Sequence, residues 1–160
     1  MRAALFVVGL ATAALALPAT AAASATDIFQ KHGLFGTWAV DCARPPSVDN
    51  PHVVYRLADG NRVQRQISIE AGKIVELSAI ESAAESGPAE LIVSWQTSEG
   101  GITNRILLRD NRMQVLDSTR SDGQKLVVAG RRVRDDTEAP RFERCSIGQS
   151  AGIPAARPAG

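Results

Sequence analysis

The sequence predicts an all-β protein, an eight-stranded antiparallel up-and-down barrel with its apolar side chains inside. Eight short runs are rich in Val, Ile, Leu, Thr, Tyr or Trp, and turn-forming residues separate them. No 11-residue window between residues 35 and 134 has the apolar spacing of an amphipathic helix. A length of 160 residues with 44% hydrophobic and 22% charged residues suits one globular domain and excludes a disordered chain.

The expected strands are bounded by residues that turn the chain cheaply. They cover residues 35–42, 52–57, 62–69, 73–80, 90–96, 102–109, 112–118 and 124–131. Pairs such as Gly60-Asn61, Gly100-Gly101 and Asp110-Asn111 stand between them and adopt positive φ easily. Because such turns are short, neighbouring strands should be antiparallel. The one expected helix is short and covers residues 27–32, before the first strand.

Side-chain alternation assigns one apolar face to the sheet. The inward positions are Val63, Ile67 and Ile69; Val75, Leu77 and Ala79; Leu91, Val93 and Trp95; and Ile102, Ile106 and Leu108. A sheet with one apolar face must cover it, and closure into a barrel does so while removing exposed edges. A two-sheet β-sandwich is the alternative.

Residues 1–25 read as a secretory signal peptide. A basic start at Arg2 leads into an apolar run over residues 3–17, and small residues follow up to Ala25. We expect cleavage before Thr26, with Ala21 as an alternative end of the segment. The run is short of the roughly 20 residues that a bilayer needs. The protein should therefore be periplasmic or secreted, from a bacterium, with no membrane span after signal removal, a domain over residues 26–145 and a disordered tail over residues 146–160.

The charge balance gives no general reason to bind nucleic acid. Removing residues 1–25 takes away Arg2 alone among charged residues, so the 18 Lys and Arg become 17 and match the 17 Asp and Glu. Polyanions attract proteins through excess positive charge. We therefore expect no nucleic-acid partner.

Cys42 and Cys145 are the two cysteines, and both lie in the exported part. An oxidising compartment favours a disulfide between them, which would tie the two ends of the domain together. A reactive thiol or half of a metal site is the other reading, although no Cys-x-x-Cys spacing is present.

No catalytic constellation is visible, so we expect no enzyme, no cofactor and no metal site. The chain has two histidines, His32 and His52, and neither has a close metal-ligating partner at i+2 or i+4. No Gly-x-Ser-x-Gly turn and no phosphate-binding glycine loop occurs.

Three polar residues fall on the face expected to point inward. Alternation places Arg65 between Val63 and Ile67, Asn104 on the sixth strand, and Asp117 on the seventh. A buried charge is costly unless it is paired or hydrogen-bonded. The functional reading is a polar-lined pocket in which Arg65 meets an anion or a ligand carboxylate. The structural reading is a bulge that turns Arg65 outward, or an Arg65–Asp117 ion pair.

Gly36-Thr37-Trp38 resembles the Gly-x-Trp opening of calycin-type barrels, which include lipocalins and secreted metalloprotease inhibitors. The resemblance implies that Trp38 plugs the closed end of the barrel, beside Gly36, and that an arginine of the last strand packs over it. Arg131, Arg132 and Arg134 are the candidates for that arginine. Residues 35–42 with Pro45 are also similar to the start of exported proteins named after invasion-associated locus B, a family that uses more cysteines.

We therefore expect an exported, non-enzymatic protein that binds a small ligand or another exported protein. One alternative is an inhibitor of an exported hydrolase, acting through residues 26–32 or 43–51. The other is a structural protein of the cell envelope.

Overall fold

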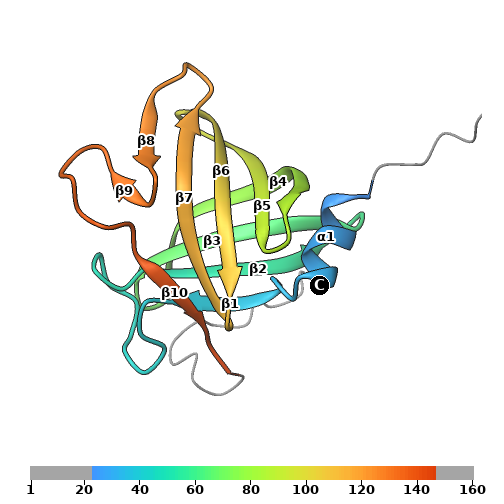
Figure 1. Cartoon of the computed structure of the whole chain (residues 1–160). Coiled ribbons are helices and arrows are strands. Elements are labelled where there is room, and N and C mark those ends of the chain that lie inside the picture. The colour runs from blue at the N-terminus through green and yellow to red at the C-terminus, as the bar shows by residue number, and fades with distance from the viewer. Residues whose placement is uncertain (1–22, 147–160) are drawn as a thin grey trace, which may run out of the picture.

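A computed structural model describes residues 23–146, which contain one helix and ten strands. In chain order they are α1 (Ala25–Lys31), β1 (Gly36–Ala39), β2 (His52–Ala58), β3 (Arg62–Glu70), β4 (Lys73–Gly87), β5 (Glu90–Thr97), β6 (Gly100–Arg109), β7 (Arg112–Arg120), β8 (Lys125–Val128), β9 (Arg131–Arg132) and β10 (Arg141–Arg144) (Figure 1). Most of the predicted signal peptide and of the predicted tail lies outside the described residues.

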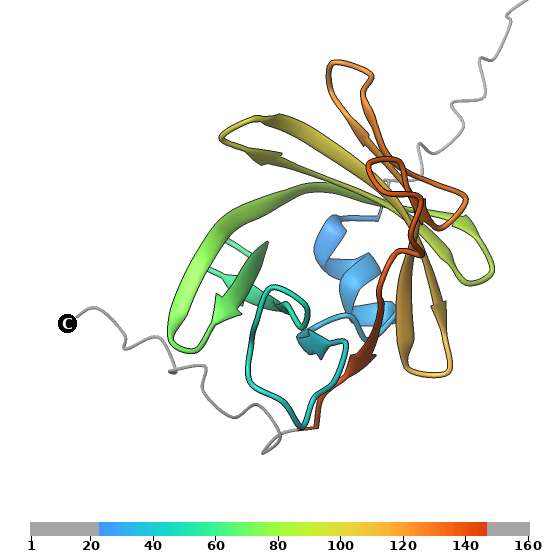
Figure 2. The ribbon, with the colours of Figure 1, turned by 90° about the vertical axis from the view of Figure 1, so that its left-hand side faces the viewer.

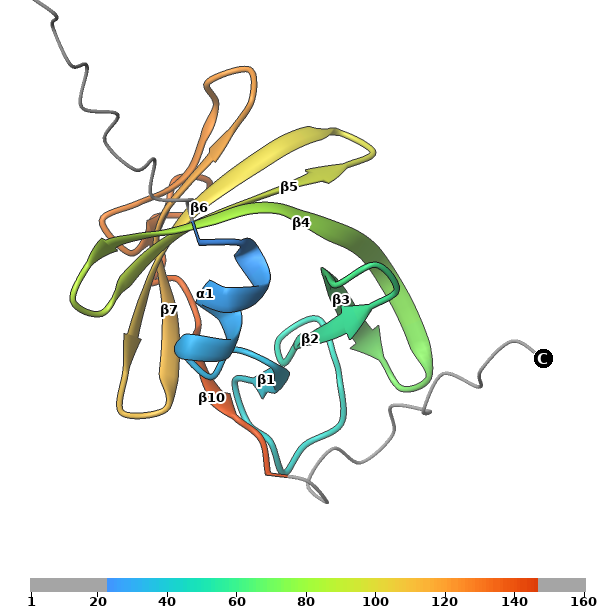
Figure 3. The same ribbon diagram turned by 90° about the vertical axis from the view of Figure 1, so that its right-hand side faces the viewer.

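The strands close into an eight-stranded antiparallel barrel, which confirms the predicted fold class over the sandwich. The neighbour order is β10-β1-β2-β3-β4-β5-β6-β7, and β10 pairs back with β7. In Figure 2 and Figure 3 the strands form a ring around α1.

The eighth barrel strand is not the one that the sequence predicted. The predicted strand over residues 124–131 contains β8, but β8 pairs only with Ser118 and Thr119 of β7 and with β9. The first residues of β7 pair instead with β10, and β10 pairs with β1. One edge of β7 thus pairs with β6, and its other edge pairs first with β10 and then with β8. The β8–β9 hairpin becomes an arm outside the ring (Figure 1).

Helix α1 fills one end of the barrel. Ser24 caps it, because its hydroxyl accepts from the Asp27 amide while the Asp27 carboxylate accepts from the Ser24 amide. Phe29 is fully buried, with its ring centroid 5.9 Å from Phe35 and 5.1 Å from Tyr55. The helix lies inside the ring of strands in Figure 3. The predicted helix therefore exists, and it begins two residues earlier than expected.

Trp38 lies at this closed end and is 3% exposed, with its indole nitrogen donating to the Leu34 carbonyl at 2.9 Å. Gly36 has φ +128°, a conformation that L side chains rarely adopt. The arginine opposite Trp38 is Arg144 of β10, which donates to the Phe35 carbonyl at 3.0 Å. Arg131, Arg132 and Arg134 were the wrong candidates, because the last barrel strand is β10.

The inward face was predicted correctly for Val63 and Ile67 of β3 and for β5, but wrongly for β4. Leu91, Val93 and Trp95 are buried, whereas Val75 and Leu77 are 45% and 56% exposed. Between the pairs Ile67–Glu76 and Ser68–Ile74, β3 advances by one residue and β4 by two, which leaves Val75 as the extra residue of a bulge. Glu76, Ser78 and Ile80 point inward instead.

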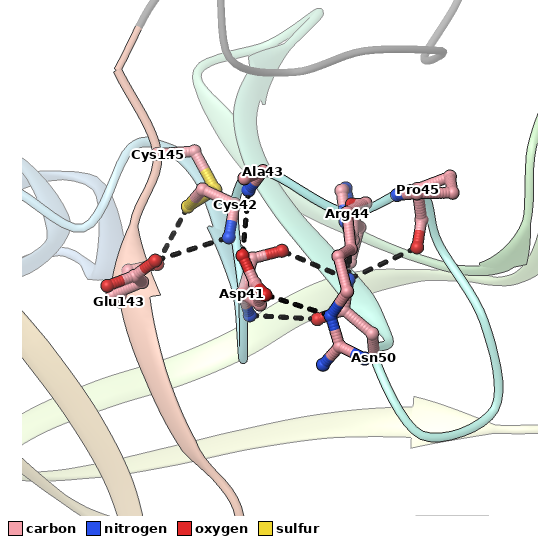
Figure 4. Close-up of a disulfide and its surroundings, with 9 residues drawn as sticks. Asp41, Cys42, Ala43, Arg44, Pro45, Asn50, Glu143 and Cys145 are labelled. Atoms are coloured by element: carbon pink, nitrogen blue, oxygen red, sulfur yellow. Dashed lines mark hydrogen bonds and ion pairs between the residues drawn. A yellow bond between two sulfur atoms is a disulfide. The ribbon is translucent and has the colours of Figure 1, made fainter.

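Cys42 and Cys145 form the predicted disulfide, with their Cα atoms 5.4 Å apart (Figure 4). The bond joins the chain just after β1 to the chain just after β10. The Glu143 carboxylate accepts from the Cys42 amide at 3.2 Å. The strand that closes the barrel is therefore fixed covalently at its end.

Candidate functional site

A cavity of about 460 Å³ opens at the end of the barrel away from α1. Its size is within the range of roughly 300–1,000 Å³ that is usual for small-molecule sites. The barrel contributes a largely apolar wall of Val53, Ile67, Ile102, Ile106, Met113, Val115 and Phe142. The β8–β9 arm and the chain after it contribute Leu126, Val127, Arg132, Arg134, Ala139 and Pro140. The arm outside the ring thus forms part of the cavity.

Arg65 is the charged centre of this cavity. Its side chain is 11% exposed and forms an ion pair with Glu76, through one terminal nitrogen. The same Glu76 oxygen accepts from the Ser78 hydroxyl at 2.9 Å. The guanidinium carbon lies 4.4 Å from the centroid of the Trp95 ring, a cation–π distance. The positive charge of Arg65 is therefore balanced by the protein's own carboxylate.

Three buried polar atoms in the cavity lining have no hydrogen-bond partner among the described residues. They are Nε of Arg65, Nε1 of Trp95 and Oδ1 of Asn104. Trp95 is 3% exposed, so its indole N–H has no access to the outer surface. A buried polar group left without a partner costs on the order of 1–3 kcal/mol. The three residues line the cavity, whereas these three atoms themselves are covered by neighbouring protein atoms.

Tyr55 also lines the cavity, next to Arg65 across the β2–β3 pair. Burial raises the pKa of the Tyr55 phenol, and the nearby charge of Arg65 acts in the opposite direction. Tyr55 is therefore a neutral hydroxyl at neutral pH.

Asp117 lies on the outer face rather than in the cavity. Consecutive β6 residues Arg105 and Ile106 pair with Asp117 and Val115, which leaves one extra residue in β7 and turns Asp117 outward. The carboxylate of Asp117 accepts from Arg105 Nε at 2.8 Å and from the Ala129 amide at 3.1 Å. Burial acts to raise the pKa of Asp117, but these two hydrogen bonds together with the charges of Arg105 and Lys125 outweigh it, and the pKa lies below its ordinary value. The Arg65–Asp117 pair, one of the alternatives that the sequence left open, does not form, and Arg65 pairs with Glu76 instead.

The structure thus brings Arg65 and Asn104 into one cavity, and it adds residues that were not singled out as site residues. Alternation had placed Trp95 inward, so its indole N–H could have been recognised as a group needing a partner. Nothing in the sequence marked Glu76 as a site residue, because its charge is neutralised by Arg65 only once β3 and β4 pair.

The two histidines lie outside the cavity. Nε2 of His32 is 2.6 Å from Glu85, and hydrogen bonds from Lys31 and His32 lower the pKa of that carboxyl. His52 is fully buried, with Nε2 3.1 Å from the Arg44 carbonyl oxygen. Burial lowers the pKa of His52, although the Arg44 carbonyl acts to raise it.

Of the two segments suspected of inserting into a hydrolase, residues 26–32 are largely taken up by α1, whose Ile28 and Phe29 are buried. Residues 43–51 form a loop that is braced from inside (Figure 4). The side-chain nitrogen Nδ2 of Asn50 lies within 3.2 Å of the backbone carbonyl oxygens of Asp41, Arg44 and Pro45. Oδ1 of the same side chain accepts from the Asp41 backbone amide. Val48 is 76% exposed on this loop.

Within residues 23–146 no three His, Cys, Asp or Glu side chains are grouped so as to hold a metal ion. The same part of the chain has no helix with the length and apolar character to cross a bilayer. No family model, curated protein or solved structure matches this chain.

Proposed function

We propose that this protein is an exported, non-enzymatic binding protein that holds a small molecule in the open end of its barrel. The observation that carries the proposal is a cavity of about 460 Å³ that has a largely apolar barrel wall and is also lined by Arg65, Trp95 and Asn104, each of which has a polar atom without a partner among the described residues. Apolar walls with a few placed polar groups are typical of ligand sites.

Export to the periplasm or the medium is supported by the signal-like residues 1–25 and by the disulfide, which suits an oxidising compartment. A cut that keeps Ser24 on the mature chain would retain the cap of α1, whereas a cut before Thr26 would remove it. The calycin resemblance is supported by the closed end, where Trp38 meets Arg144 of the last strand.

Fluorescence tests the proposal because the two tryptophans lie in different places. Trp95 lines the cavity and Trp38 does not, so a Trp38→Phe variant emits from Trp95 alone. The neutral dye N-phenyl-1-naphthylamine absorbs tryptophan emission and should quench Trp95 saturably in that variant. Enhancement of the dye's own emission should be lost in Ile106→Glu, which places a charge in the wall. Absence of saturable quenching would contradict the proposal.

A protein-binding role is the second candidate, and the loop over residues 43–51 favours it. A loop braced by Asn50 and anchored by the disulfide pays little ordering entropy on binding, and Val48 offers an apolar contact at its surface. Inhibition of elastase, which accepts small side chains, tests this role. Activity loss with the wild-type protein and none with Val48→Asp would support it; equal effects of the two proteins would count against it.

A further inference from the structure

We propose that the cavity selects an uncharged and largely apolar ligand that carries an amide or lactam group, and that it discriminates against carboxylates. This inference rests on the proposed function and names its ligand class. It differs from the sequence-based interpretation in which Arg65 binds an anion or a ligand carboxylate.

The charge of Arg65 is already used. One terminal nitrogen of the guanidinium pairs with Glu76, whose accepting oxygen also receives the Ser78 hydroxyl. A ligand carboxylate beside Arg65 would share one guanidinium with Glu76 in a partly desolvated site. Two carboxylates so placed repel each other, and one of them would have to take up a proton. An uncharged acceptor avoids that repulsion.

The unpartnered atoms specify a hydrogen-bonding pattern. Arg65 Nε–H and Trp95 Nε1–H are donors, and Asn104 Oδ1 is an acceptor. In the β5–β6 pair Asn104 faces Val93 while Trp95 faces Ile102, so Asn104 and Trp95 are diagonal neighbours. Such neighbours have Cβ atoms roughly 7–8 Å apart or less. A ligand amide carries a carbonyl acceptor and an N–H donor without a net charge, and a side-chain shift that uncovers the Trp95 and Asn104 atoms would let it bond to both.

The rim offers the one competing place for an anion that we identify in the described chain. Arg132 and Arg134 line the mouth of the cavity, and Arg134 is paired with Asp135. A ligand whose carboxylate pairs with Arg132 at the mouth would place only its apolar part inside the cavity. The side chain of Arg132 therefore has its own variant in the test.

The experiment measures displacement of N-phenyl-1-naphthylamine by 2-naphthamide, 2-naphthoate and naphthalene, which share one ring system. We expect 2-naphthamide to bind the wild-type protein tightest, by at least about tenfold over 2-naphthoate. Glu76→Gln removes the internal carboxylate and frees the charge of Arg65, so it should reverse that order. Glu81→Gln is the matched control, because it makes the same change on the outer face of β4, where Glu81 meets Gln96.

Tighter binding of 2-naphthoate to the wild-type protein, lost in Arg132→Gln, would overturn the inference and leave small-molecule binding standing. Equal affinities of 2-naphthamide and naphthalene would also overturn it, since the polar atoms would then contribute nothing. Absence of displacement by all three compounds, with no dye binding, would overturn the proposed function as well. If Glu76→Gln does not fold, as circular dichroism would reveal, the wild-type ranking decides alone.

Discussion

Removal of the disulfide should weaken the closure of the barrel more than any other part of the fold. Strand β10 has three register pairs with β7 and two with β1, so few backbone contacts hold the closing seam. Cys42 and Cys145 are separated by 103 residues, and loop-closure entropy assigns a crosslink of that span about 4–5 kcal/mol. For a domain of about 120 residues this corresponds to a fall in Tm of roughly 15 °C.

The assay is thermal unfolding followed by circular dichroism. Cys42→Ala with Cys145→Ala is the suitable variant, because both positions are buried and serine would place hydroxyls there. Wild-type protein treated with reductant should have the same Tm as the variant. In the reduced protein, backbone hydrogen exchange should accelerate first at Phe142 and Cys145. A fall in Tm of less than about 5 °C would refute the view that the bond carries the closure.

Three further outcomes are expected. Trp38→Ala should cost about 3–5 kcal/mol, measured by urea unfolding, because it removes a buried ring and its bond to Leu34; dye binding to the folded protein should remain, and loss of dye binding at unchanged stability would place Trp38 in the site. Phe29→Ala should cost a similar amount in the same assay, and a change below about 1 kcal/mol would show that α1 does not fill the barrel end. Because the pKa of His52 is lowered, its imidazole binds fewer protons in the folded chain than in the unfolded one. The contribution of neutral His52 to the free energy of unfolding is therefore fully present above about pH 6.5 and is lost as the pH falls below it. The urea midpoint should therefore fall between about pH 7.5 and 5.5, and His52→Gln should flatten that fall. An unchanged pH dependence of the midpoint in His52→Gln would contradict the assignment.

The closed barrel could be predicted because most of its strands and turns have recognisable patterns within a few residues of sequence. Turn residues such as Asn61, Asp110 and Asn111 do adopt positive φ, and the apolar alternation of β5 is regular. The disulfide was predicted from the cysteine count and from the oxidising compartment that the sequence led us to expect. Each of these signals lies within a few residues of chain or in composition, where a sequence can be read directly.

The orientation of Asp117 and Glu76 and the identity of the closing strand could not be predicted, because they depend on bulges and on pairing between distant strands. One extra residue in β7 moved Asp117 to the outer face, because the side-chain period of a strand is two. Glu76 follows the bulge at Val75 and points inward, where Arg65 of the neighbouring strand neutralises it, and an isolated strand pattern does not contain that information. The closing strand β10 is four residues long, too short for a recognisable alternation, and its place depends on β1, β7 and Cys42.

The indole N–H resonances test the claim of a ligand-binding cavity most directly. The chain has two tryptophans: Trp38 donates to Leu34, and Trp95 has no acceptor among the described residues. In a ¹H–¹⁵N spectrum, assigned with Trp38→Phe, added 2-naphthamide should move the Trp95 indole signal downfield and leave that of Trp38 in place. An unmoved Trp95 signal at saturating 2-naphthamide would contradict the account.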